Sequence, residues 1–189
     1  MFSYPLKMDC YLALIEKRHY KKFFNFIEKN REYYRGILHF IDNLKNEKDS
    51  EAFILNSLGM MIEGKMVFWG IWSKEDIVGE VSIRDIDEEF KSAEIGYFVD
   101  KDFEGKGIVS QACKILINYV FKEFDIERLE LGCDVKNIKS QHIADKLGFK
   151  IEGIARKGFV ADGKLVDCSI YSLLKSEYKD IGLRNQENG

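Results

Sequence analysis

The sequence predicts an α+β domain with a mixed, mostly antiparallel central sheet flanked by helices. Three short β-rich runs follow one another at 66–72, 77–85 and 92–99, and the polar turns between them indicate an antiparallel meander. Apolar residues at helical spacing precede and follow these runs. The chain has a single proline, Pro5, and no Gly/Ser-rich linker, so we expect residues 1–189 to form one domain.

Composition and charge exclude several classes of protein. The chain is 46% hydrophobic and 32% charged, its net charge is −3, and we expect no nucleic-acid partner. No stretch approaches the length of a membrane span and the N-terminus lacks a signal-peptide core, which predicts a cytoplasmic protein without a membrane partner. The four cysteines have no CxxC or Cys/His spacing, so we predict reduced packing residues and no metal: Cys10, Cys113, Cys133 and Cys168.

The first third of the chain is predicted to hold one strand and then helices. Residues 10–16 (CYLALIE) suit a strand. Residues 17–42 carry aromatic and aliphatic side chains at helical spacing, and we expect two short helices with a break near Asn30. A further helix fits 48–63. Its capping candidates are Asp49 and Ser50.

Helices and strands alternate after the meander. A helix with one apolar face is expected at 108–124, an alternating strand at 128–135, a helix at 140–147 and strand structure from Phe149 onward. The dipeptide Asp162-Gly163 lies between two β-rich arms, which is typical of a hairpin with a type I′ turn.

Residues 102–121, DFEGKGIVSQACKILINYVF, form a glycine-containing turn that leads into a helix. Such a turn directs free backbone N–H groups and the positive end of the helix dipole toward a phosphate. The spacing fits neither a Walker loop nor the dinucleotide fingerprint GxGxxG. Taken alone, Gly105 and Gly107 equally fit a tight connection without a ligand.

The order AEIGYFV, EGKGI, helix, strand, VKNIKSQHIADKLGF resembles the GNAT N-acetyltransferase superfamily, and is most similar to its RimJ/RimL branch of ribosomal-protein N-terminal acetyltransferases. The resemblance covers about residues 6–178. It implies a GNAT-like fold in which the fourth and fifth strands, at 92–99 and 128–135, are parallel and splayed apart. It also implies acetyl-CoA as co-substrate, with its pyrophosphate in the glycine turn and its pantetheine arm between the two strands.

The resemblance assigns coenzyme-binding residues to this chain. Two of them depart from the family's [QR]xxGx[GA] turn, because Glu104 stands at its head and Val109 at its close. An acid beside a pyrophosphate is unfavourable, so we expect Glu104 to contribute its backbone only. The expected coenzyme-binding residues are Tyr97, Phe98, Val99, Glu104, Gly105, Lys106, Gly107, Ile108, Val109, Ser110, Asn137 and Ser140.

Acetyl transfer to an amine needs a base for the amine and an acid for the leaving thiolate. Many members of the superfamily use a Tyr seven residues after the Asn, where this chain has Ala144. The resemblance then favours Ser140 as the acid, although a Ser here also suits a helix N-cap. Glu94 is the candidate base, and its alternative is an exposed strand acid paired with a cross-strand Lys or Arg.

The absence of an evident strong base favours an α-amine as the acceptor. An α-amine has a pKa of about 7.7–8.0 and a lysine of about 10.4, so only the former is appreciably neutral at pH 7. We therefore expect a protein N-terminus as the acceptor. The alternatives are a small amine (a polyamine, amino sugar or antibiotic) and a non-catalytic acyl-CoA-binding module.

The resemblance implies that the early helices and the late hairpin form the acceptor site. Asp167 matches an acid that recurs in the RimJ/RimL branch, and its alternative is a partner in a β-bulge or turn. The exposed late hairpin is also a candidate homodimer contact. The candidate walls of the acceptor site are Tyr33, Tyr34, His39, Phe40 and Trp69.

Overall fold

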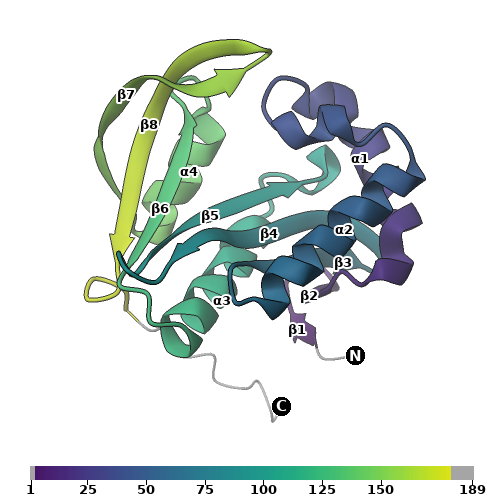
Figure 1. Ribbon diagram of the computed structural model, residues 1–189, viewed down its shortest axis with the longest axis horizontal. Coiled ribbons are helices and arrows are strands. Elements are labelled where there is room, and N and C mark those ends of the chain that lie inside the picture. The colour runs from purple at the N-terminus through teal and green to yellow at the C-terminus, as the bar shows by residue number, and fades with distance from the viewer. Residues whose placement is uncertain (1–2, 180–189) are drawn as a thin grey trace.

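An eight-stranded sheet with the strand order β1-β2-β3-β4-β5-β6-β8-β7 forms the centre of the molecule (Figure 1). The structure is a computed structural model and describes residues 3–179. The strands are β1 (Ser3–Pro5), β2 (Cys10–Leu14), β3 (Val67–Ser73), β4 (Asp76–Asp87), β5 (Ser92–Val99), β6 (Arg128–Asp134), β7 (Lys150–Ala161) and β8 (Lys164–Leu174). The helices are α1 (Tyr20–Tyr34), α2 (Glu47–Ile62), α3 (Ile108–Glu123) and α4 (Ile138–Leu147), with 3-10 turns at Lys17–His19, His39–Asn43 and Lys101–Phe103.

The sheet is mixed, as the sequence predicts. β5 and β6 run parallel, and the other neighbouring strands are antiparallel. The meander β3-β4-β5 is confirmed, and so is the hairpin β7-β8. Its two turn residues, Asp162 and Gly163, have φ values of 50° and 68°, the positive pair that a type I′ turn requires. The short edge strand β1 was not predicted.

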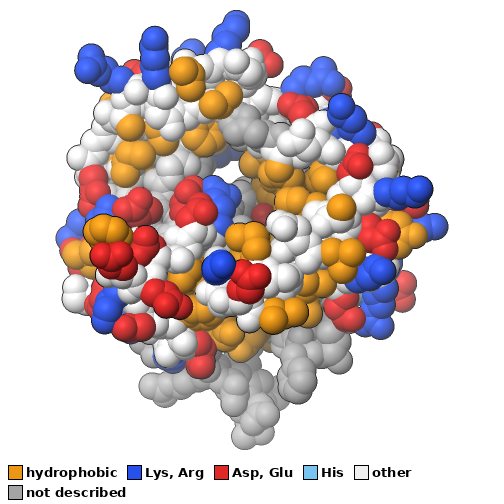
Figure 2. Space-filling view, viewed as in Figure 1, with side chains coloured by type: hydrophobic (Ala, Val, Ile, Leu, Met, Phe, Trp, Pro, Cys, Tyr) orange, Lys and Arg blue, Asp and Glu red, His pale blue; other side chains and the backbone are white. Residues whose placement is uncertain are grey.

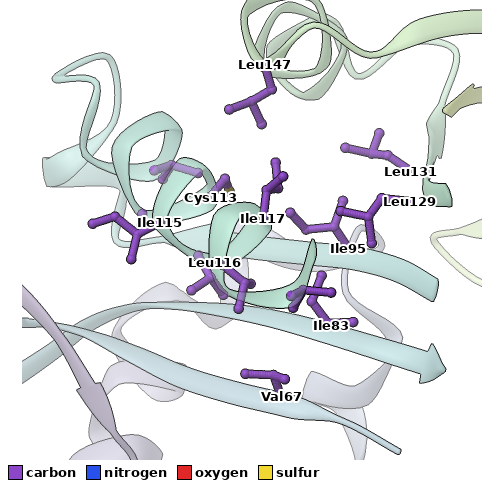
Figure 3. Close-up of a cluster of buried hydrophobic side chains, with 14 of the residues drawn as sticks. Val67, Ile83, Ile95, Cys113, Ile115, Leu116, Ile117, Leu129, Leu131 and Leu147 are labelled. Atoms are coloured by element: carbon purple, nitrogen blue, oxygen red, sulfur yellow. The ribbon is translucent and has the colours of Figure 1, made fainter. Parts of the chain in front are cut away.

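Helices cover both faces of the sheet. Helices α1 and α2 pack on one face, where aromatic side chains dominate the apolar cluster. Helices α3 and α4 pack on the other face, and α3 places a continuous row of aliphatic side chains against β4, β5 and β6 (Figure 3). All four cysteines are free and buried, which confirms that they are packing residues. Within residues 3–179 no helix is long and apolar enough to cross a membrane.

The predicted break near Asn30 is wrong, because α1 continues through it. Asn30 is buried, and its amide Nδ2 donates to the carbonyl of Phe26, one turn earlier, at 3.0 Å. Its Oδ1 accepts from the backbone N–H of Lys101 at 3.3 Å. One end of the amide is therefore satisfied within α1 and the other by the turn that follows β5, so the buried side chain does not interrupt the helix.

The predicted caps of the second long helix are also wrong. Asn46 is the N-cap of α2, and its side chain accepts from the backbone N–H groups of Lys48 and Asp49. Asp49 completes a capping box, since its carboxylate accepts from the N–H of Asn46 at 3.1 Å. Ser50 lies inside the helix and is buried.

The parallel strands β5 and β6 are joined over only a short segment and then separate. The pairing begins at Ser92 and Arg128 and ends at Glu94 and Glu130. Beyond Glu94, β5 remains paired with β4 on its other side. The expected splay is confirmed, and it leaves a wedge between the two strands in which backbone groups need other partners.

Tyr34 supplies such a partner at the open end of the wedge. Its hydroxyl donates to the carbonyl of Val99 at 2.5 Å and accepts from the N–H of Val99 at 3.3 Å. The ring is buried, and burial raises the pKa of the hydroxyl, so it stays protonated and can donate. α1 therefore holds the end of β5 in place of the missing strand.

Polar contacts fix the base of the β7-β8 hairpin to β6. The guanidinium of Arg128 on β6 binds both carboxylate oxygens of Glu152 on β7, at 2.7 and 2.6 Å. Ser172 on the intervening β8 donates to the same carboxylate at 2.7 Å. The Arg128 pair, followed by the Ser172 hydrogen bond, holds the pKa of Glu152 at about 2. These contacts connect β6, β7 and β8 at one point. The homodimer contact predicted for this hairpin stays a prediction.

We predict that Tyr34→Phe lowers the free energy of unfolding by about 1–3 kcal/mol, because both backbone groups of Val99 lose their partner in a buried place. Urea unfolding followed by circular dichroism measures the change. Tyr20→Phe is the matched control, since Tyr20 lies on the same helix and is only partly buried. Equal losses in the two variants would show that the hydroxyl of Tyr34 does not support β5.

Candidate active site

The glycine turn lies at the mouth of the wedge, between the end of β5 and the start of α3. Gly105 and Gly107 have φ values of 70° and 77°, in the left-handed region that favours glycine. A Cβ at Gly105 would meet no atom within 4 Å, so it is the backbone conformation, and not lack of space, that favours glycine. Gly107 is the N-cap of α3, and no side chain caps this helix end. The first amides of α3 are therefore available to an anion.

The side chains around the turn have distinct environments. Ile108, Val109 and Ser110 are buried at the start of α3. The ammonium of Lys106 lies 5.2 Å from the centroid of the Phe103 ring. Lys106 is thus held beside the turn by a cation–π contact.

Glu104, the least expected residue of the turn, is neutralised by a lysine from another element. Lys139 on α4 donates to the Glu104 carboxylate at 2.6 Å, and also to the hydroxyl of Tyr33 at 2.5 Å. Tyr33 on α1 in turn contacts both carboxylate oxygens at 2.8 Å. The contacts with Glu104, and next those with Tyr33, raise the pKa of Lys139. We call Tyr33, Glu104 and Lys139 the bridge, because they connect α1, the glycine turn and α4 across the mouth of the wedge.

The start of α4 brings Asn137 and Ser140 to the other side of the wedge. Asn137 is the N-cap, and its side chain accepts from the N–H of Ser140 at 3.1 Å. The N-cap alternative for Ser140 is therefore wrong, and α4 begins at Ile138, two residues before the predicted start. The Ser140 hydroxyl lies 3.0 Å from the hydroxyl of Tyr97, which reaches it from β5. Burial raises the pKa of Tyr97, so its hydroxyl remains a donor.

Glu94 has the cross-strand partner that its alternative required. Arg84 faces it on β4, and the guanidinium contacts the carboxylate at 2.5 Å. Gly96 leaves room for this arginine, because a Cβ there would lie 2.7 Å from an Arg84 nitrogen. Glu94 is therefore an ion-paired acid on the face of the sheet that carries α1 and α2, and its role as the base stays a prediction.

A cleft of about 410 Å³ opens on this face between β5, β6 and the β7-β8 hairpin. Figure 2 shows the hollow between the hairpin and the helical side of the molecule. The charged side chains that line it balance, with Arg84 and Lys157 against Glu94 and Glu130. The tip of the hairpin meets the turn after α1, where the Asp162 N–H donates to the carbonyl of Gly36 at 2.9 Å.

None of the described side chains that were predicted to contact the acceptor lines the cleft. Asp167 accepts from the N–H of Lys157 at 2.9 Å within the irregular part of the hairpin, as its alternative predicted. Tyr34 is buried at Val99, and Trp69 packs on the opposite face of the sheet against Tyr119. The side chain of His39 lies outside the part of the chain that the structure describes. The assignments of Tyr34, His39, Trp69 and Asp167 as acceptor contacts stay predictions.

Sequence reasoning missed one polar residue on this face, Glu80 of β4. It is 6% exposed, and its Oε1 has no hydrogen-bond partner among the described residues. The signal in the sequence is a single acid inside the apolar run IVGEVSI, since a buried strand seldom carries an unpaired charge. Within residues 3–179 no cluster of His, Cys, Asp or Glu side chains is suited to hold a metal ion.

Comparison with known proteins agrees with the fold. A family model described as an acetyltransferase (GNAT) domain matches residues 10–150. A segment of 110 residues is 39% identical to YdaF of Bacillus subtilis (strain 168), but covers only 58% of this chain and 60% of that relative. The ribosomal-protein-serine acetyltransferase of Escherichia coli (strain K12) is 26% identical over 161 residues, which is 85% of this chain and 90% of that protein.

A solved structure shows the same architecture. RimL, a ribosomal L7/L12 alpha-N-protein acetyltransferase in complex with coenzyme A, aligns with a TM-score of 0.87 and 21% identity, over 94% of this chain and 100% of that one. At this identity the likeness concerns the fold. Because the family model spans most of the chain, the protein belongs to the GNAT acetyltransferase family and is an acetyl-CoA-dependent N-acetyltransferase.

Proposed function

We propose that the acceptor is the N-terminal α-amine of a protein or peptide, of the ribosomal-protein type, and that the enzyme acts in the cytoplasm. The observation that carries this proposal is the cleft: it opens between the hairpin and the helical side, and its lining charges balance. A polyamine carries several positive charges and would favour an enclosed acidic pocket. The relationship to the ribosomal-protein-serine acetyltransferase supports the same acceptor.

The residues of the wedge fit acetyl-CoA as the substrate that supplies the acetyl thioester. The glycine turn and the uncapped start of α3 provide backbone donors for a diphosphate. β5 separates from β6 beyond Glu94, so Tyr97 lies in a segment without a strand on that side and can offer backbone groups to a pantetheine arm, whereas both backbone groups of Val99 are already bound by Tyr34. We assign the diphosphate to residues 104–110 and the arm to these backbone groups and Asn137.

Ser140 is our candidate for the acid that protonates the leaving thiolate. Its hydroxyl is in contact with Tyr97 at 3.0 Å, and together the two form a pair of neutral hydroxyl groups beside the wedge. Burial raises the pKa of the neighbouring Cys133 thiol to about 11, although a hydrogen bond with Ser140 lowers it in part. This thiol therefore stays neutral as well. A neutral donor beside a developing thiolate stabilises the transition state.

We predict that peptides with a free N-terminus become acetylated there. In the test, the protein and acetyl-CoA are incubated with a peptide that has a free N-terminal amine and one internal lysine, and mass spectrometry locates the acetyl group. The matched control is the same peptide with a blocked N-terminus, which should remain unmodified. Acetylation of spermidine without acetylation of any peptide would replace the proposed acceptor by a small amine.

We predict that Ser140→Ala lowers kcat at least about tenfold and leaves the Kd for acetyl-CoA within about twofold, because only the hydroxyl is lost and the backbone bond to Asn137 remains. Stopped-flow turnover and calorimetric binding give the two constants. Ser172→Ala is the control, since this hydroxyl serves Glu152 at the base of the hairpin. An unchanged kcat would remove Ser140 from the chemistry.

We predict that Lys139→Met raises the Kd for acetyl-CoA about tenfold, because it leaves the Glu104 carboxylate without its counter-ion beside a diphosphate. Glu104→Gln in the same chain should restore most of the affinity, since it removes the uncompensated charge. Isothermal titration of the single and double variants forms the cycle. Lys150→Met, which removes the partner of Glu177, is the control, and wild-type affinity in Lys139→Met would contradict the prediction.

A further inference from the structure

Glu80 is a buried carboxyl group on the acceptor side of the sheet, with one oxygen that has no hydrogen-bond partner among the described residues. Its side chain lies in a second cavity of about 220 Å³ between β4 and the helices α1 and α2. Aromatic rings form most of this cavity. Its lining residues are Phe23, Phe40, Phe53, Met66, Phe68, Glu80, Ser82 and Arg84. Leaving a buried carboxyl oxygen without a partner is costly, and no structural contact of Glu80 Oε1 offsets this cost.

The position of Glu80 connects this cavity to the wedge. Along the strand pairing, Glu80 is opposite Phe98 and Ser82 is opposite Gly96. Both β5 residues lie beyond Glu94, in the segment that has left β6 and borders the wedge. Arg84 lines both this cavity and the larger cleft. The carboxyl group therefore lies on the strand next to the β5 segment that borders the wedge, in a cavity that shares the Arg84 side chain with the acceptor cleft.

The surroundings leave Glu80 able to accept a proton. Burial raises its pKa to about 7, and the hydrogen bond from Ser82 and then the charge of Arg84 act in the opposite direction. Arg84 is occupied by Glu94, and across the sheet the buried thiol of Cys113 is neutral because burial raises its pKa. The helices on this side present rings, not charges, to the cavity, namely Phe23 of α1 and Phe53 of α2, and Phe68 from β3 adds a third ring.

We propose that Glu80 is the general base of the acetyl transfer and takes the proton of the acceptor ammonium, directly or through one water. The carboxylate accepts the proton, and the neutral amine nitrogen bonds to the thioester carbonyl carbon. The nitrogen of the resulting adduct then gives up its second proton to a neighbouring hydroxyl group, which protonates the thiolate as the C–S bond breaks, so that a neutral amide and a neutral thiol leave. This assignment rests on acetyl transfer to an amine, and holds for a peptide and for a small amine alike. Glu94 is the competing base, but its carboxylate is engaged by Arg84.

The test measures kcat against pH for the wild type and for Glu80→Gln, at saturating acetyl-CoA and peptide acceptor. The wild-type kcat should rise through an apparent pKa near 7. In Glu80→Gln this inflection should disappear and kcat at pH 7 should fall about a hundredfold. If the wild type acetylates a small amine and no peptide, the proposed acceptor fails, and the same comparison made with that amine still tests Glu80.

Two further variants make the result decisive. Glu88→Gln removes an exposed acid of the turn between β4 and β5 and should keep the wild-type profile. Glu94→Gln is the rival: loss of the inflection in Glu94→Gln and its retention in Glu80→Gln would overturn the proposal. An unchanged profile in Glu80→Gln would do the same.

Stability against pH separates loss of a base from loss of the fold. The pKa of Glu80 is higher in the folded state than its usual 4.5, so its ionisation destabilises the fold as the pH rises from about 4.5 through about 7. Glu80→Gln should therefore unfold at a urea midpoint equal to or above that of the wild type at pH 8, with no such gain at pH 4. A lower midpoint at pH 8 would identify Glu80 as a structural residue.

Discussion

The wedge between β5 and β6 is the constraint on which the rest of the structure depends. Two parallel strands that part after Glu94 and Glu130 leave backbone N–H and C=O groups without a strand partner. Such groups are costly when buried, and each must find another partner. Tyr34 of α1 takes this role at Val99, and the capped start of α4 closes the β6 side. The helices are thus placed where the sheet is incomplete, and the remaining backbone groups are free for the pantetheine arm that we propose.

Charged side chains around the wedge are likewise paired with residues from distant segments of the chain. Glu104 would oppose a diphosphate if it stood alone. The bridge of Tyr33, Glu104 and Lys139 removes this difficulty and, in addition, ties α1 and α4 to the glycine turn. On the acceptor face, Arg84 pairs with Glu94 and leaves Glu80 without a direct ion pair. Glu80 and Glu94 are the same residue type on the same face of the sheet, but their different surroundings give them different chemistry.

Local signals in the sequence predicted the parts of the fold that depend on backbone conformation. Asp162-Gly163 indicated its turn, because a type I′ turn needs only two neighbouring residues, and the GNAT fold was expected from the resemblance of the motifs around Gly105 and Gly107 to that family. The break predicted near Asn30 was wrong because this asparagine finds its second partner at Lys101, far along the chain. The partner of Glu104 depends on contacts between separate elements in the same way, so no local pattern could have revealed it, whereas the only local signal of Glu80 is its place inside the apolar run IVGEVSI.

The hydrogen bond between Asp162 and Gly36 has a consequence for how an acceptor arrives. The halves of the sheet meet at the pairs from Ser92 to Glu94 at one end of the wedge, and the hairpin tip meets the turn after α1 at the other. Together with the strands and helices between them, these contacts form a closed loop of protein around the cleft. A free chain end can be threaded through a closed loop, whereas a lysine in the middle of a folded surface can enter only if the loop opens. Selection for termini would then follow from topology, before any side chain of the acceptor is recognised.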